Sequence, residues 1–145
     1  MVNRPSCQTT AATDNDCSDA GVAYVYTRSS GGTPWSLEAY VKAPNIGAGD
    51  NFGTEVALSG DTLAVGAYYE DSCSTSVSGT AATDNGCSYV GAVYVYTRSG
   101  TTWSFQAYVK APNAEAGDQF GWSVALLGDT LAVGASGEVQ AIGED

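Results

Sequence analysis

The residues best suited to chemistry are four cysteines in two pairs, Cys7 with Cys17 and Cys73 with Cys87. Neither pair has the Cys-x-x-Cys spacing of a zinc knuckle or a redox site. Several pairings are conceivable, but each pair encloses a similar Thr-Ala-Ala-Thr-Asp-Asn segment, which favours local bonding. We predict two disulfide bonds that close two polar loops, with reduced, inert thiols as the alternative. Disulfides indicate an oxidising compartment, so we expect a secreted or cell-surface protein.

Carboxylate and amide side chains gather around both predicted cystine loops. Such oxygens are the ligands that Ca²⁺ uses, so calcium is the cofactor that these loops could hold. The alternative is a solvated turn, which we favour because Asp and Asn are common in turns through local hydrogen bonds. The candidate calcium ligands are Asp14, Asn15, Asp16, Asp19, Asp71, Asp84 and Asn85.

Composition argues against several classes of function. The chain has no histidine, the commonest general base and metal ligand, and no carboxylate lies in a distinctive motif outside turns, so we expect no enzyme. A net charge of −11 repels phosphate backbones, which excludes nucleic acid as an expected partner. The apolar runs are only a few residues long, so we expect no membrane insertion.

An internal repeat organises the rest of the sequence. Residues 21–67 align with residues 91–135, and most aligned positions are identical once two residues of the Ser-Ser-Gly-Gly turn are omitted. The shared segments are Tyr-Val-Tyr-Thr-Arg-Ser, Trp-Ser, Ala-Tyr-Val-Lys-Ala-Pro-Asn, Ala-Gly-Asp-x-Phe-Gly and Gly-Asp-Thr-Leu-Ala-Val-Gly-Ala. A repeat of this length that carries several short strands is typical of a β-propeller blade or a β-solenoid unit.

Each repeat contains four predicted strands. β-Branched and aromatic residues alternate in them, and Gly-Asp turns or Ala-Pro-Asn segments end them. The strands are predicted at 23–27 and 93–97, 35–43 and 103–111, 52–59 and 120–127, and 62–67 and 130–135. No segment has a sustained helical period, so the predicted fold class is all-β.

The pairing of Asp-x-Phe-Gly with a later Val-Gly-Ala resembles the FG-GAP repeat of integrin α-subunit propellers and of large bacterial surface proteins. The resemblance implies blades of four antiparallel strands, with roughly six to eight blades closing a ring. It also implies core anchors at Phe52 and Phe120, and close backbone approach at Gly53, Gly66, Gly121 and Gly134. The calcium loop of integrin repeats has shrunk here to Ser59-Gly60-Asp61 and Leu127-Gly128-Asp129, which is too short to supply the oxygens. We do not expect that family site in this chain.

Residues 1–145 are predicted to form a single module, and the order of the strands divides this module into segments. Residues 52–111 form one whole blade that includes the cystine loop 73–87, and residues 21–43 and 120–135 form half-blades on either side. A first cystine loop, 1–20, and a tail, 136–145, complete the chain. Half-blades leave unpaired edges. We favour completion by other copies, as a ring or a filament, over the alternative that the chain is a fragment of a longer repeat protein.

The predicted function is non-enzymatic adhesion or structural assembly outside the cell by a homo-oligomer or polymer. The alternative is a glycan-binding, lectin-like propeller, and a protein ligand also stays open. Trp122, with Asp50 and Asp118 beside the Phe-Gly pairs, would then form a ligand surface. Against this, the repeated Trp35 and Trp103 fit packing between blades, and the two aspartates fit acceptors of backbone N–H groups in turns.

Overall fold

Alternating β-branched, aromatic and small residues form eight strands in residues 17–32 and 34–139, the part of the chain that this computed structural model describes. No helix occurs in these residues, and accordingly none is long and apolar enough to cross a membrane. The strands are β1 (Ala23–Thr27), β2 (Ser36–Val41), β3 (Glu55–Ser59), β4 (Thr62–Ala67), β5 (Ala92–Ser99), β6 (Thr102–Val109), β7 (Phe120–Leu127) and β8 (Thr130–Ala135).

The strands form three antiparallel sheets. The central sheet has the order β3-β4-β5-β6, and it is flanked by an N-terminal hairpin, β1-β2, and a C-terminal hairpin, β7-β8. Two-residue Gly-Asp turns connect β3 to β4 and β7 to β8, where Ser59 pairs with Thr62 and Leu127 with Thr130. The all-β prediction of one four-stranded blade between two half-blades is confirmed.

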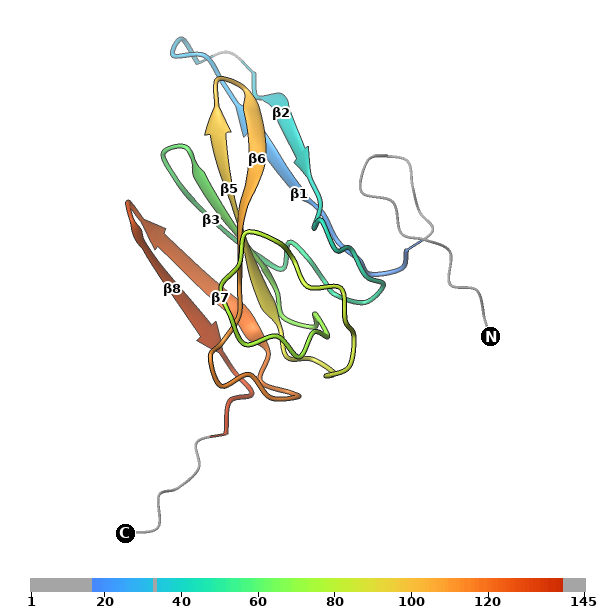
Figure 1. The fold of residues 1–145 in the computed structure, drawn as a ribbon. Helices are drawn as coiled ribbons and strands as arrows, with labels where there is room; N and C mark the ends of the chain where they lie inside the picture. The colour runs from blue at the N-terminus through green and yellow to red at the C-terminus, as the bar shows by residue number, and fades with distance from the viewer. Residues whose placement is uncertain (1–16, 33, 140–145) are drawn as a thin grey trace.

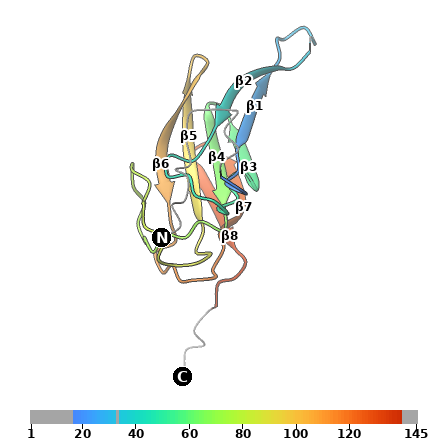
Figure 2. The ribbon, with the colours of Figure 1, turned by 90° about the vertical axis from the view of Figure 1, so that its right-hand side faces the viewer.

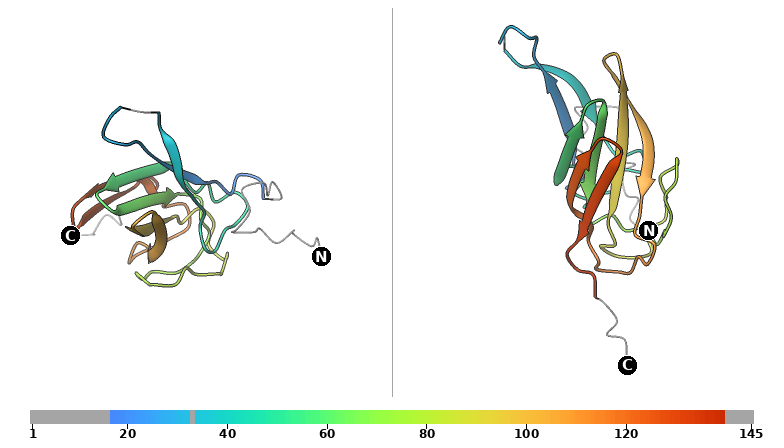
Figure 3. Two further views of the ribbon diagram at one scale, coloured as in Figure 1. Left: turned by 90° about the horizontal axis from the view of Figure 1, so that it is seen from above. Right: turned by 90° about the vertical axis from the view of Figure 1, so that its left-hand side faces the viewer.

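The two hairpins lie on opposite faces of the central sheet (Figures 1 and 2). Successive residues of a strand point to opposite faces of its sheet. Strand β4 therefore contacts one hairpin with each of its two faces. Val65 joins the core shared with β1 and β2, whereas the next residue, Gly66, lies against the backbone of Gly121 in β7. In the view from the left side, the C-terminal hairpin lies in front of the central sheet (Figure 3).

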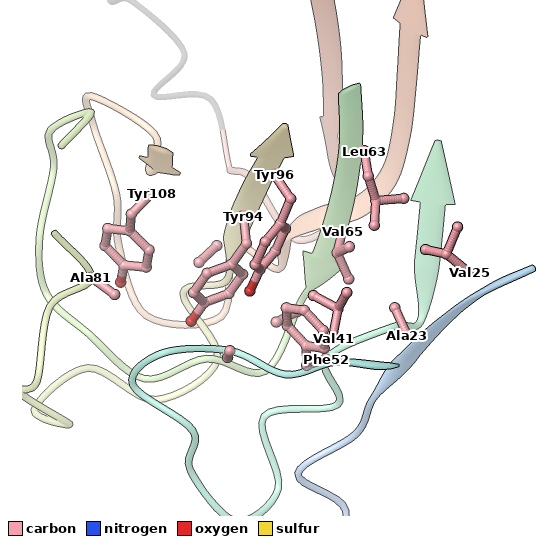
Figure 4. Close-up of a cluster of buried hydrophobic side chains, with 13 residues drawn as sticks. Ala23, Val25, Val41, Phe52, Leu63, Val65, Ala81, Tyr94, Tyr96 and Tyr108 are labelled. Carbon is pink, nitrogen blue, oxygen red and sulfur yellow. The ribbon is translucent and has the colours of Figure 1, made fainter. Parts of the chain in front are cut away.

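The main core lies between the N-terminal hairpin and the central sheet (Figure 4). Phe52 is only 2% exposed, and its ring packs edge-on against Tyr94 and Tyr96 at centroid distances of 5.2 and 6.3 Å. Ala23, Val25 and Val41 cover this group from the hairpin side. Packed aromatic pairs of this kind contribute roughly 0.5–1.5 kcal/mol beyond their buried area.

Each Phe-Gly pair holds two neighbouring sheets together through the backbone. Phe52 donates its N–H to Ala20 O at 3.0 Å, and Phe120 repeats this with Val90 O at 2.8 Å. The following glycines, Gly53 and Gly121, have φ values of 94° and 91°. A Cβ at either position would collide with a carbonyl oxygen of the preceding sheet, so only glycine fits there.

The loop between β4 and β5, residues 68–91, covers the outer edge of the central sheet (green to yellow in Figure 1). Ser78 and Tyr108 exchange two backbone hydrogen bonds of 2.9 and 2.7 Å, so β6 has a short extra partner beyond β5. Covering an edge in this way limits pairing with foreign strands. Cys7, Asp14, Asn15, Asp16 and residues 140–145 of the predicted tail lie outside the described residues.

Candidate functional site

Among the strand edges that are unpaired in the described part of the chain, those of β1 and β8 have repeat equivalents that pair with another strand. β1 pairs only with β2, and β8 pairs only with β7. Their repeat equivalents, β5 and β4, pair with each other in the central sheet. The central sheet therefore shows how the two open edges would fit together.

The N-terminal hairpin exposes large aromatic and aliphatic side chains. The equivalent tyrosines of the central sheet are buried. Tyr24 and Tyr26 are 53% and 52% exposed, whereas the equivalent Tyr94 and Tyr96 are 0% and 5% exposed. Trp35 and Leu37 are also more than half exposed. Apolar side chains exposed together on one element indicate a surface that binds another molecule.

A polar cluster joins the N-terminal hairpin to the central sheet. Arg98 donates from Nη1 to Glu38 Oε1 at 2.9 Å and from Nε to Asp61 Oδ1 at 2.8 Å. The same Glu38 oxygen accepts a 2.8 Å hydrogen bond from Trp103 Nε1. These donors lower the pKa of Glu38, and the two carboxylates raise the pKa of Arg98. Glu38 was not a predicted site residue, because it lies 60 positions from Arg98 in the sequence.

A second charged cluster is buried beside the central sheet. Lys110 Nζ lies 2.7 Å from Glu70 Oε2, and the two residues are 3% and 1% exposed. Tyr108 donates its hydroxyl hydrogen to Glu70 Oε1 at 2.8 Å. Burial lowers the pKa of Lys110 and, with the Glu70 charge, raises the pKa of Tyr108. A paired, hydrogen-bonded charge is tolerated inside a protein, but loss of one partner is costly.

The repeated geometry agrees with the sequence comparison. The profile of the FG-GAP repeat matches residues 35–96 and 103–144. The chain belongs to the FG-GAP repeat family. It has no significant match among curated proteins. FG-GAP repeats form β-propeller-type modules that are commonly extracellular, which agrees with the disulfide bond described below.

The two aspartates of the FG-GAP signature lie in buried turns. Asp50 and Asp118 are 5% and 4% exposed, and Asp118 Oδ2 accepts a 2.7 Å hydrogen bond from Glu115 N. Burial, reinforced by the charges of Glu70 and Asp71, raises the pKa of Asp50 to about 7. Trp122, the third residue predicted at a ligand surface, lies instead on β7 and is 48% exposed.

The cystine loop of the whole FG-GAP blade is stapled by Cys73–Cys87, whose Cα atoms are 5.1 Å apart. Asp84 accepts hydrogen bonds from Ser72 Oγ and Cys73 N, and these donors lower its pKa. Asp71 Oδ1 accepts from Tyr89 N at 2.8 Å. Cys17 is disulfide-bonded too, although its predicted partner is among the residues left undescribed.

Of the predicted calcium ligands that the structure describes, only Asp19 and Asp71 line a common pocket, and Asp84 and Asn85 do not join them there. No group of three or more acidic or cysteine side chains is placed to hold a metal within residues 17–32 and 34–139. Asp71 and Asp84 bond to the loop that carries them, and Asn85 is exposed in that loop. Asp19 lies on a different loop, in a left-handed backbone conformation with a φ of 55°.

Four aromatic rings form a continuous row beside the FG-GAP turns. Trp122 contacts Tyr68, Tyr68 contacts Tyr69, and Tyr69 contacts Tyr89, at centroid distances of 4.9, 4.1 and 4.6 Å. The row ends at an open pocket of about 340 Å³ lined by Asp19, Ala48, Gly49, Asn51, Tyr69, Asp71 and Tyr89. Sequence reasoning identified Trp122 and the acidic residues separately but not this pocket, because its tyrosines carry no repeated motif.

Proposed function

We propose that this FG-GAP chain is a non-enzymatic extracellular module for adhesion or structure that assembles head to tail. In such an assembly β8 of one copy pairs with β1 of the next, and the two hairpins complete a four-stranded blade. The observation that supports this most directly is the β4–β5 pair, which joins the equivalents of the two open edges. Head-to-tail contacts produce rings when they close and filaments when they do not.

The β4–β5 register sets the expected register between copies. Leu63 pairs with Tyr96 and Val65 with Tyr94 in the central sheet. The equivalent pairs between copies are Leu131 with Tyr26 and Val133 with Tyr24. This register would place the two exposed tyrosines beside Phe120, as Tyr94 and Tyr96 lie beside Phe52.

Proline at position 133 tests the open edge directly. Arg98 N donates to Asp61 O at 2.8 Å. Hydrogen-bonding residues alternate along an antiparallel pair, so Val65 directs its N–H toward β5. Val133 is the equivalent of Val65, and its N–H points to the open edge of β8. Val133→Pro removes that donor while leaving the β7 pairing intact.

We expect multi-angle light scattering and negative-stain microscopy to show oligomers or filaments for the wild-type chain and monomers for Val133→Pro. Val133→Ala is the matched control, because it shortens the side chain but keeps the N–H and should still assemble. A discrete mass indicates a closed ring, and a broad distribution of lengths indicates a filament. A wild-type chain that stays monomeric at high concentration contradicts the proposal.

A second candidate function is saccharide binding in the pocket beside Tyr89. Tyr89 is 51% exposed and lines this pocket with Tyr69, and the carboxylates of Asp19 and Asp71 lie on its wall. Aromatic faces with a few oriented polar groups are typical of ligand sites. We expect neutral oligosaccharides on a glycan array to bind the wild-type chain and not Tyr89→Ala, with Trp122→Ala, outside the pocket lining, as the control. Equal binding by the wild type and Tyr89→Ala would count against this site.

A further inference from the structure

An open cavity separates the central sheet from the C-terminal hairpin. It has a volume of about 260 Å³ and is lined by Thr62, Val95, Thr97, Gln106, Leu126, Gly128, Asp129 and Leu131. It opens beside β8, whose outer edge has no strand partner in the described residues. Gln106 and Asp129 are the polar side chains on its wall that are exposed to solvent.

The equivalent place between the N-terminal hairpin and the central sheet is filled by side chains. We call each contact between neighbouring sheets a joint. Glu38 and Asp61 are the repeat equivalents of Gln106 and Asp129, and both bond to Arg98. The guanidinium of Arg98 stacks over Trp103 at 5.1 Å, and the indole nitrogen also donates to Glu38. An arginine–tryptophan pair from β5 and β6 therefore lies between the N-terminal hairpin and the central sheet.

The N-terminal hairpin carries the same pair, already stacked and exposed. The Arg28 guanidinium lies 4.8 Å from the Trp35 ring centroid, and Trp35 is 62% exposed. Arg28 and Trp35 are the repeat equivalents of Arg98 and Trp103. Little reorganisation is needed for this pair to bind, because the stacked arrangement exists before binding.

We propose that the cavity is a binding site for the Arg28–Trp35 pair of a second copy of this chain. Asp129 accepts a hydrogen bond from the incoming guanidinium, and the side-chain oxygen of Gln106 accepts from the same guanidinium and from the indole N–H. The inference rests on the proposed head-to-tail assembly and adds the charged contact that selects the partner. The site is incomplete without the second copy.

The joint inside the chain and the proposed joint between copies differ in one acceptor residue. Glu38 is ionised at the internal joint, where Arg98 lowers its pKa, whereas Gln106 is a neutral amide at the open one. Hydrogen bonds to ionised acceptors are roughly twice as strong as those to neutral ones. The contact between copies is thus the weaker version of the internal contact, and Gln106→Glu should make association several-fold tighter.

A charge exchange tests the site. Arg28→Asp alone places two carboxylates together at every joint between copies, and Asp129→Arg alone places two guanidinium groups together. Each variant should associate at least about tenfold more weakly than the wild type, because like charges at an interface are strongly unfavourable. In an equimolar mixture every joint between unlike copies pairs opposite charges, so the mixture should form even-numbered rings or filaments with the association strength of the wild type in light scattering. Recovery also shows that both variants are folded.

The remaining outcomes separate this inference from the proposed function. If each single variant assembles as tightly as the wild type, the strands join without this contact and the inference is wrong while the assembly proposal stands. Failure of the mixture to recover, with both variants folded by circular dichroism, overturns the inference as well. If the wild-type chain itself is monomeric, the assembly proposal fails first and the inference with it.

Discussion

At the residue scale, burial changes the protonation of Asp50 in a way that stability measurements can detect. Its pKa in the folded protein is about 7, against about 3.9 for an aspartate in an unfolded chain. The folded state therefore holds the proton more tightly. The stability that this group contributes is complete below about pH 4 and declines as the pH rises to about 7, by up to about 1.4 kcal/mol per pH unit.

Asp50→Asn should remove this dependence. We expect the free energy of unfolding of the variant, relative to the wild type, to rise between pH 5 and pH 8 in urea denaturation experiments. Asp118→Asn, in the equivalent turn of the next repeat, is the control. It measures how much free energy of unfolding is lost when a turn carboxylate is replaced by an amide. Parallel pH profiles for Asp50→Asn and the wild type would show that Asp50 is ionised throughout.

At the scale of elements, the molecule treats its strand edges differently. β6 is covered by the cystine loop through Ser78 and Tyr108, whereas β1 and β8 stay open within the described residues. A loop that covers an edge has to be held in place, and the Cys73–Cys87 bond closes the base of this one. We therefore expect the disulfide to keep this loop in place over the edge of β6.

Replacing both cysteines tests this role. We expect Cys73→Ser with Cys87→Ser to lower the free energy of unfolding by about 3 kcal/mol, the typical value for a loop of this length. The amide of Tyr108 should also exchange hydrogen faster, because its bond to Ser78 O depends on the loop. The amide of Val65, inside the central sheet, is the internal reference. Unchanged exchange at Tyr108 would mean that other loop contacts suffice to hold it.

At the scale of the whole molecule, the repeat explains how much could be predicted. Two near-identical copies of Tyr-Val-Tyr and Thr-Leu-Ala-Val-Gly-Ala predicted the strands and their order, because periodicity and turns are local properties. The partners of the charged residues were harder. Glu38 with Arg98 and Glu70 with Lys110 join residues 60 and 40 positions apart. A single carboxylate on a strand or in a loop, such as Glu38 or Glu70, gives no sign in the sequence of which sheet will face it.

The pocket and the open cavity were beyond sequence reasoning for a related reason. Tyr69, Asp71 and Tyr89 belong to the variable connection between β4 and β5, where the two repeats differ and no motif marks a site. The cavity beside β8 is open because the C-terminal hairpin has no further strand partner in the described residues. One of its acceptor residues is Gln106, at the position where the other repeat has Glu38. That substitution is visible in the sequence, but its meaning required the geometry of Arg98.

The unlike edges of β1 and β8 give any filament built from this chain a polarity. One end always presents the arginine-bearing hairpin, and the other always presents the acceptor cavity, so the two ends differ in structure and in their rates of growth and loss. A molecule that offers only one of these edges would cap a single end and leave the opposite end free to elongate. The length of such a fibre and the direction of its growth could therefore be set separately.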